Sequence, residues 1–195
     1  MNILDEKALD IIFRNARTYN GWLDKDVTDA QLKQIFDLLK FGPTSANCSP
    51  MRIKFLKTDE AKAKLKPHLM EGNVDKTMGA PAIAVMANDL EFYEKLPKLF
   101  PHTDARSWFV GNDELIKSTA FRNGTLQGAY LIIAARAIGL DCGPMLGFDT
   151  EGVKNEFFKD ENVEVNFLCN IGYGDESAIF HKLPRLSFDE ACRIT

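Results

Sequence analysis

Five short segments hold most of the polar side chains that could bind a ligand. The richest is residues 41–50, Phe-Gly-Pro-Thr-Ser-Ala-Asn-Cys-Ser-Pro. Its prolines and glycine set the backbone path, and its Ser, Thr and Asn side chains are short donors and acceptors that can reach a ligand or cap a helix. Such a loop can present backbone N–H groups to a planar, polar ring. An ordinary helix-to-strand connection would have the same composition, and composition alone favours that interpretation.

The other four segments supply charge and glycine. Two of them contain Arg17 and Arg185, each beside the end of a predicted element. A guanidinium group matches the oxygens of a phosphate monoester in a bidentate way, so the two arginines are candidates for an anion site. A lone arginine is more often a solvated surface charge. Residues 71–73 and 143–147 are the remaining two segments. The glycines of residues 143–147 permit close approach of the backbone to a ligand, but these residues could equally form a turn between two helices.

Several common catalytic patterns are absent from the sequence. It has no G-x-G-x-x-G after a predicted strand, no G-x-x-x-x-G-K-[ST] and no G-x-S-x-G, so a nicotinamide-binding Rossmann domain, a P-loop and a nucleophile elbow are not expected. No two cysteines form a C-x-x-C pair, and the histidines do not fall at metal-ligand spacing. We therefore expect no metal site.

The composition is that of an ordinary globular protein. The chain has 195 residues, of which 45% are hydrophobic and 27% charged, and a formal net charge of −4. This length suits one compact domain, which we place over residues 1–195. The acidic balance argues against nucleic acid as a partner. The sequence has neither an apolar run of about 18 residues nor a signal-peptide pattern, so we expect no membrane partner and a cytoplasmic location.

The periodicity of apolar residues predicts an α+β domain that is rich in helices and has a small sheet. One helix has a clear start, because Thr28 and Gln31 have the spacing of a capping box. Residues 89–112 are rich in aromatic residues and form either an excursion or lid, or a surface helix pair with a hydrophobic underside. Helices are expected at 6–17, 28–42, 59–70 with a break at Pro67, 113–138, 149–158 and from 187, and strands at 52–57, 81–87 and 163–171.

Six motifs occur in an order that resembles one family. They are Arg17-Thr18 before Trp22, residues 42–50, Gly72-Asn73, residues 143–148, residues 171–173 and Leu183-Pro184-Arg185. Together they resemble the FMN-dependent nitroreductase-like oxidoreductases over nearly the whole chain. Further segments are similar to the malonic semialdehyde reductase branch of that family, which belongs to pyrimidine degradation. Those segments are residues 100–102, 104–108, 120–123 and 183–191.

The resemblance implies a fold and an assembly. The fold would be a nitroreductase-like α/β sandwich, in which helices flank a small, mostly antiparallel sheet. Two chains would form an intertwined homodimer, with the long helix from Asp113 making much of the interface. FMN would bind at this interface, so that each site draws residues from both chains.

The matched motifs also imply three groups of FMN contacts. The first group would hold the phosphate or ribityl end, and the second would meet the pyrimidine edge and the N5 side of the ring. The third group would approach the flavin from the partner chain. The first group is Arg17, Thr18, Asn20 and Arg185. The second group is Asn73, Met145, Leu146 and Gly147. The third group is Pro43, Thr44, Ser45 and Asn47.

The implied reaction is hydride transfer from NADH or NADPH through FMN to a small oxidised substrate. The closest resemblance implies malonic semialdehyde, which would be reduced to 3-hydroxypropanoate. The flavin would carry the chemistry, so no side chain is expected to be the catalytic acid or base. The substrate carboxylate needs a cation, for which Arg106 and Arg122 are candidates. Two alternatives stay open: a NAD(P)H nitroreductase or quinone reductase of broad specificity, and a flavin- or ligand-binding protein without turnover.

Overall fold

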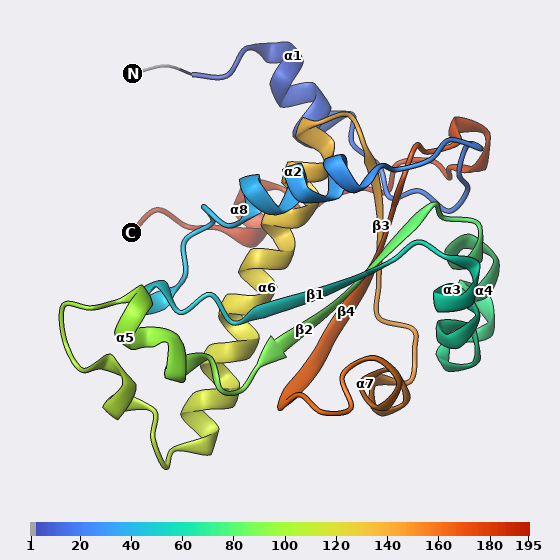
Figure 1. Ribbon diagram of the computed structural model, residues 1–195. Coiled ribbons are helices and arrows are strands. Elements are labelled where there is room, and N and C mark those ends of the chain that lie inside the picture. Colours follow the sequence, from blue (N-terminus) through green and yellow to red (C-terminus); the bar gives the residue numbers. More distant parts are fainter. Residues whose placement is uncertain (1–2) are drawn as a thin grey trace.

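The centre of the fold is β2, Ala82–Asp89, whose eight residues are all buried. In the computed structural model, which describes residues 3–195, β2 lies in a sheet with β1 (Met51–Leu56), β4 (Val163–Gly172) and β3 (Asp141–Met145). The strand order is β1-β2-β4-β3, and all three pairings are antiparallel (Figure 1). β1 and β3 are therefore the edge strands of the sheet.

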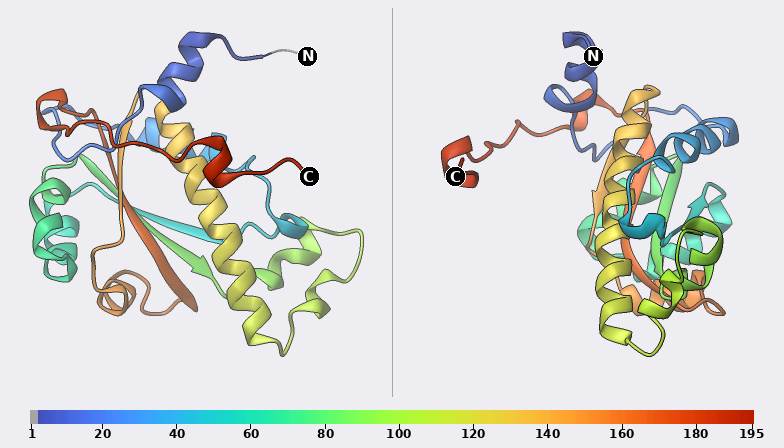
Figure 2. Two further views of the ribbon diagram at one scale, coloured as in Figure 1. Left: turned by 180° about the vertical axis from the view of Figure 1, so that it is seen from behind. Right: turned by 90° about the vertical axis from the view of Figure 1, so that its left-hand side faces the viewer.

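Helices cover both faces of the sheet. The side chains of β2 alternate between two cores: Ala82, Ala84 and Met86 pack in one, and Ile83 and Val85 in the other. α2 and α6 contribute to the first core, and α3 and α7 to the second; Figures 1 and 2 show these two layers. The helix bounds are α1 Glu6–Leu9, α2 Asp29–Leu39, α3 Asp59–Leu65, α4 Glu71–Met78, α5 Leu96–Leu99, α6 Asp113–Ala137, α7 Thr150–Phe157 and α8 Phe188–Ala191.

The predicted capping box at the start of α2 is confirmed. The Thr28 side chain accepts a hydrogen bond from the backbone N–H of Gln31 at 3.2 Å, and the Gln31 side chain accepts one from the backbone N–H of Thr28 at 3.0 Å. Loss of such a cap usually costs about 1 kcal/mol of stability. The cap determines the residue at which α2 begins. The apolar face of α2 packs against α6.

The long helix α6 approaches the sheet closely because it carries two glycines. A Cβ at Gly124 would lie 1.8 Å from the Asn88 Oδ1 atom, and one at Gly128 would lie 2.5 Å from the ring of Phe167. Both contacts are too short for any side chain, so the glycines allow the backbone of α6 to lie against β2 and β4.

Two segments differ from the prediction. Residues 143–147 were expected to form a ligand-binding loop or a turn between helices, but residues 141–145 form the edge strand β3. Gly143 and Pro144 have low strand propensity, so the sequence does not predict a strand here. Pro144 is tolerated because an edge strand forms hydrogen bonds along one side only. The helix predicted over 59–70 ends at Leu65, and a 3₁₀ turn at Lys66–His68 separates it from α4. Residues 71–73, one of the five polar segments of the sequence, begin α4.

Residues 89–112 form a third packed layer. Phe92, Leu96 and Phe109 are buried with Cys48 and with the start of α6. At the base of the segment, the Asp89 carboxylate accepts hydrogen bonds from Arg52 Nη2 at 2.5 Å and from the backbone N–H of Glu91 at 2.8 Å. Its short helices therefore have a hydrophobic underside, as the second interpretation proposed.

The C-terminal segment extends away from the rest of the chain. All of residues 181–195 are exposed, and Figure 2 shows the segment, which includes α8, reaching past α6. We call residues 181–195 the C-terminal arm. Among residues 3–195, no helix is long and apolar enough to cross a membrane.

The packing of α6 can be tested with a pair of alanine substitutions. Gly124→Ala should lower the free energy of unfolding by about 1–3 kcal/mol, because the new Cβ overlaps Asn88. The matched control is Gly72→Ala in α4, where a Cβ meets nothing within 4 Å and should stabilise by up to about 1 kcal/mol. Urea denaturation at one fixed protein concentration measures both. An unchanged midpoint for Gly124→Ala would contradict the close packing.

Candidate cofactor site

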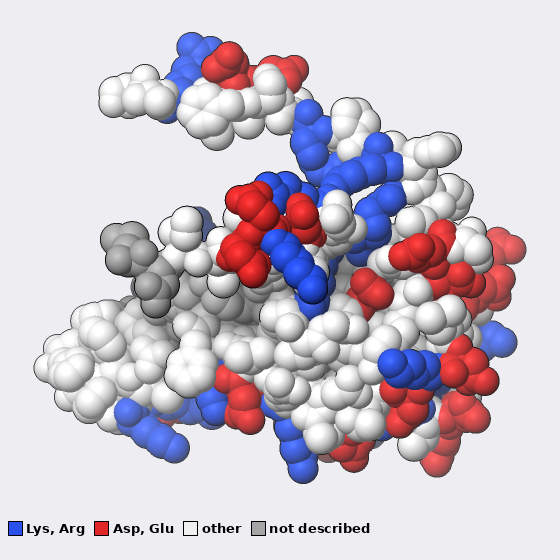
Figure 3. Space-filling model, turned by 90° about the horizontal axis from the view of Figure 1, so that it is seen from above, with Lys and Arg blue, Asp and Glu red and all other residues white. Residues whose placement is uncertain are grey.

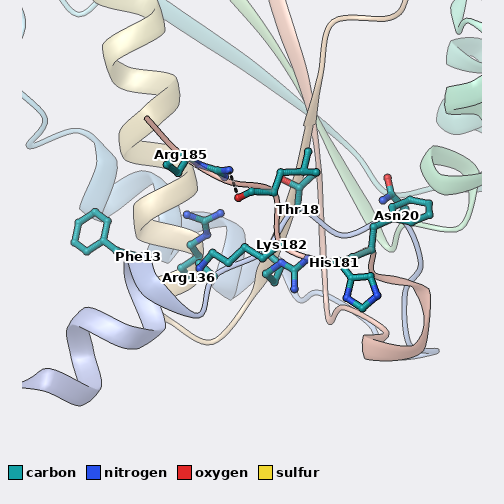
Figure 4. A pocket seen from close by; sticks show the side chains of 11 residues that line it. Phe13, Thr18, Asn20, Arg136, His181, Lys182 and Arg185 are labelled. Carbon is teal, nitrogen blue, oxygen red and sulfur yellow. Dashed lines mark hydrogen bonds between the residues drawn. The ribbon is translucent and has the colours of Figure 1, made fainter. Parts of the chain in front are cut away.

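A cavity of about 710 Å³ lies where the C-terminal arm leaves the body of the molecule. Its volume is in the range of small-molecule and cofactor sites. Figure 3 shows Lys and Arg side chains gathered there, and Figure 4 shows the cavity from close by. The lining residues are Phe13, Ala16, Arg17, Thr18, Asn20, Arg136, Phe180, His181, Lys182, Leu183 and Arg185. All four members of the predicted phosphate group are among them.

The cavity is strongly basic. Arg17 follows the N-terminal helical segment, Arg136 stands in the last turn of α6, and Lys182 and Arg185 belong to the arm. None of the residues that line the cavity is acidic. Within residues 3–195, these four side chains form no salt bridge, and their hydrogen bonds go to backbone carbonyl groups. The cavity therefore has the charge and the free donors that an anion such as a phosphate requires.

β3 connects this cavity to the second predicted group. Thr18 forms an isolated parallel bridge with Cys142, and the backbone N–H of Tyr19 donates to the Cys142 carbonyl at 3.2 Å. From Cys142 the strand continues to Met145, a distance of about 10 Å for an extended chain. The loop that carries Arg17 thus lies beside the N-terminal end of β3. Three residues of the second group, Met145 to Gly147, lie at its C-terminal end.

At that other end, α4 and the loop after β3 meet through Asn73. The Asn73 side chain donates to the Gly147 carbonyl at 2.8 Å, and the backbone N–H of Met70 donates to the same oxygen at 3.1 Å. A Cβ at Gly147 would lie 2.2 Å from Asn73 Nδ2, so a larger residue here would displace the Asn73 amide. Leu146 is exposed, whereas Met145 is buried. Asn73, Met145, Leu146 and Gly147 therefore form one cluster, as the motifs implied.

The third group, Pro43 to Asn47, lies elsewhere in the same chain. Its loop packs beside α5, on the side of the sheet away from α4 (Figure 1). The backbone N–H of Ser45 donates to Asn123 Oδ1 at 2.8 Å, and the Asn47 side chain donates to the Leu99 carbonyl at 2.9 Å. Ala46, Asn47 and Ser49 have positive φ angles of 49°, 51° and 40°. The loop thus holds an unusual backbone shape, and one chain does not bring it to the other two groups.

Burial also determines the protonation state of Cys48, the cysteine of this loop. Cys48 has no exposed surface and packs under residues 89–112. Burial raises the pKa of its thiol to about 11, so the thiol stays protonated at neutral pH. Cys48 therefore has a packing role in the loop.

The two candidates for the substrate carboxylate differ in their surroundings. Arg106 donates two hydrogen bonds to the Glu94 carboxylate, each of 2.7 Å, and this pair raises the pKa of Arg106 and lowers that of Glu94. Arg122 is exposed on α6, beside the exposed Phe121. The structure brings neither arginine to the basic cavity. Arg122 has the freer guanidinium group of the two among the described residues.

Sequence reasoning missed several residues of the cavity. Arg136 and Lys182 add two positive charges, and Phe13 and His181 add ring surface. His181 and Lys182 stand directly before the motif that contains Arg185, so the local density of basic residues was a usable signal. Arg136 gave no such signal, because a basic residue in the last turn of a helix is common. Among residues 3–195 no cluster of side chains suits a metal ion.

Comparison with known proteins places this geometry in a family. Residues 14–173 match the model described as "Nitroreductase family". The chain belongs to the nitroreductase family. It is 59% identical to a protein of Polynucleobacter asymbioticus over 99% of this chain and 98% of that protein, and 57% identical to one of Burkholderia lata over 100% of both; each is named "Putative NADH dehydrogenase/NAD(P)H nitroreductase".

Solved structures confirm the nitroreductase-like fold. A nitroreductase-type protein from Exiguobacterium sibiricum, determined in complex with FMN, superimposes with a TM-score of 0.83. The match covers 100% of this chain and 99% of that chain at 18% identity, so it establishes the fold alone. The predicted α+β class with a small antiparallel sheet between helices is therefore confirmed for this nitroreductase-family chain. The placement of a single domain over residues 1–195 stays a prediction, and residues 1 and 2 lie outside the described part.

Proposed function

We propose that this nitroreductase-family protein binds FMN and uses NADH or NADPH to reduce a small oxidised molecule. The observation that carries the proposal is the arrangement along β3. A cavity with four cationic side chains, none of which pairs with a carboxylate within residues 3–195, lies at one end, and the Asn73–Gly147 cluster lies at the other. A ligand with a phosphate on a flexible chain and a flat polar ring would use both ends. The residues present therefore fit FMN.

We further propose that two chains complete each site. The loop from Pro43 to Asn47 is separated from the other two groups in one chain, so it would reach the flavin of a partner. Several large apolar side chains are exposed in this chain, and a second chain would provide a cover for them. They are Phe36 and Phe41 around α2, Phe121 and Leu126 on α6, and Leu183, Leu186 and Phe188 in the arm.

The roles of the chain's own residues follow from their positions. Arg17 and Arg185 would hold the phosphate, and Thr18 and Asn20 would contact the ribityl end. Asn73 would orient the ring through its amide while it stays bonded to Gly147. When bound, FMN supplies the hydride chemistry, and the protein contributes orientation, electrostatics and exclusion of water. No side chain of the proposed site has to act as a general acid or base.

For the substrate we propose malonic semialdehyde, which would be reduced to 3-hydroxypropanoate. The support is the similarity of residues 100–102, 104–108, 120–123 and 183–191 to the malonic semialdehyde reductase branch. A second candidate is a nitroreductase or quinone reductase of broad specificity, which the printed names of the relatives favour. The two candidates share the cofactor site and differ in whether a cation meets the substrate carboxylate. Arg122 is the preferred candidate for this cation, because the Glu94 carboxylate engages Arg106.

The cofactor can be tested with the purified protein. We expect the protein to be yellow, or to become yellow with added FMN, and to bleach when NADH or NADPH is added without oxygen. Absorbance spectra before and after reductant measure both properties. A protein that takes up no FMN would contradict the whole flavin proposal. A yellow protein that neither reductant bleaches would support binding without turnover.

The shared site can be tested by complementation between chains. One variant carries Arg17→Gln and Arg185→Gln, and the other carries Ser45→Trp, at an exposed position of the loop. Each variant alone should retain little FMN. Co-expressed chains should recover up to one FMN per dimer, because one site of the mixed dimer keeps both intact halves. No recovery in isolated mixed dimers, or a folded monomer that retains FMN, would contradict the shared site.

The substrate assignment can be tested with Arg122→Ala. The Michaelis constant for malonic semialdehyde should rise about tenfold or more, because a charge-assisted hydrogen bond is lost, while that for a neutral quinone should not change. Arg106→Ala is the matched comparison and should have the smaller effect. Equal losses on both substrates would contradict the role of Arg122. A wild-type preference for nitroarenes over the aldehyde would favour the second candidate.

A further inference from the structure

Two buried amide side chains of α6 have no role in the site described above. Asn123 and Gln127 are 6% and 5% exposed and lie four residues apart, on one face of the helix. We infer that both are positioning residues, which hold the loop at residues 43–50 in the place that the flavin site of a partner chain requires. The inference rests on the proposed function and adds two residues to it. Asn123 belongs to the motif at residues 120–123, of which the proposed function uses Arg122 alone.

The first support is the pair of hydrogen bonds that these side chains accept. Asn123 Oδ1 accepts from the backbone N–H of Ser45 at 2.8 Å, and Gln127 Oε1 accepts from that of Met51 at 2.9 Å. Ser45 lies near the start of the loop and Met51 directly after its end, so both ends are attached to one helix. The Asn123 amide also donates to the Thr119 carbonyl at 2.8 Å, which directs its oxygen toward the loop. An apolar side chain at either position would leave a backbone donor unpaired.

The second support is the backbone conformation of the loop. Ala46, Asn47 and Ser49 have positive φ angles, which are unfavourable for residues other than glycine. Such conformations persist where surrounding contacts hold them, and they are concentrated at functional sites. Bonds inside the loop, such as that from the Ser49 N–H to Thr44 Oγ1 at 3.1 Å, support its shape. The bonds to α6 determine where this shape lies on the molecule.

The third support is the close contact of α6 with both ends of the loop. A Cβ at Gly42 would lie 2.7 Å from the Tyr130 ring, and one at Gly128 would lie 3.3 Å from Met51 Cε. Tyr130 follows Gln127 by three residues, so it belongs to the same face of the helix. One face of α6 therefore meets residues 42, 45 and 51, where the chain passes from α2 to β1 (Figure 1).

The attachment to α6 also determines what the loop exposes. The N–H of Ser45 is directed inward to Asn123, whereas Ser45 as a whole is exposed, as are Pro43 and Asn47. Within residues 3–195, the Ser45 hydroxyl group has no hydrogen-bond partner, so it is available to a ligand. If an attachment were lost, these exposed groups would shift relative to the partner. The shift would alter the flavin site of the partner and not the site of the same chain.

The first experiment measures amide hydrogen exchange by NMR. Gln127→Met removes the acceptor at nearly constant length, and the Met51 amide should then exchange about fivefold faster relative to the amides of β2, which report global unfolding. Gln127→Glu keeps an acceptor oxygen and should restore most of the protection, because Gln127 Nε2 has no hydrogen-bond partner in the described part of the chain. Unchanged exchange at Met51 in Gln127→Met would overturn the anchoring.

The second experiment places Gln127→Met in either chain of a mixed dimer, isolated with a different tag on each chain. One chain carries Arg17→Gln and Arg185→Gln, so the only working flavin site uses the phosphate group of the other chain and the loop of this one. In the first dimer, Gln127→Met is in the chain with the arginine substitutions, and the altered loop serves the working site. In the second dimer it is in the other chain, and the altered loop serves the disabled site.

The two dimers contain the same substitutions, so a general loss of stability affects them alike. Compared with the mixed dimer without Gln127→Met, the affinity for FMN should fall about fivefold or more in the first dimer and by less than about twofold in the second. Asn123→Leu, placed in the same two ways, should give the same order. Equal losses in the two dimers, or no loss in either, would overturn the positioning role.

These outcomes separate the inference from the proposed function. If FMN binds and bleaches with reductant, but the two dimers do not differ, the positioning role is wrong and the proposed cofactor chemistry stands. If the wild-type protein takes up no FMN, the proposed function fails, and the role of both amides at a flavin site fails with it. Faster exchange at Met51 in Gln127→Met would then still support the anchoring of the loop to α6.

Discussion

The burial of β2 between two helical layers is the constraint on which the rest of the structure depends. Because all eight of its residues are buried, both faces need an apolar cover and both edges need a paired strand. β1 and β4 pair with its edges, and α6 lies close against the sheet through Gly124 and Gly128. The remaining strand, β3, must then lie at the edge of the sheet. The candidate site follows this edge.

An edge strand suits a cofactor better than a central strand does. Only one side of β3 is paired with β4, so its other side is open to the loop that carries Arg17 and Thr18. The strand is also a rigid connection between the basic cavity and the Asn73–Gly147 cluster. A ligand that spans both would be positioned by the sheet and not by loops alone. This is the physical basis for the proposed FMN site in a nitroreductase-family fold.

The exposed apolar and basic residues of the C-terminal arm support the proposed association of two chains. The arm exposes the large apolar side chains of Leu183, Leu186 and Phe188. In the described part of the chain, the basic residues of the arm also lack carboxylate partners. Two needs therefore coincide at the arm: an apolar cover, which the proposed partner chain would supply, and a negative charge, which the proposed phosphate would supply. Assembly and cofactor binding would then depend on each other.

Sequence alone determined the features that rest on local chemistry. The capping box of Thr28 and Gln31 and the strand at residues 81–87 were recognisable, because each follows from residue types at a characteristic spacing. The first and second groups of proposed cofactor contacts lie in segments that the sequence presents as motifs. Sequence did not reveal β3, because Gly143 and Pro144 have low strand propensity and only pairing with β4 makes them a strand.

Tertiary structure alone decided what meets in space. It brought Arg136 of α6 and Lys182 of the arm to the side of Arg17, across more than a hundred residues of sequence, and no periodicity encodes such a meeting. It also showed that Glu94 engages Arg106, and that the loop from Pro43 to Asn47 lies apart from the other groups. The reason is physical: local propensity acts between near neighbours in the chain, whereas a cavity is made by the packing of elements that are distant in sequence.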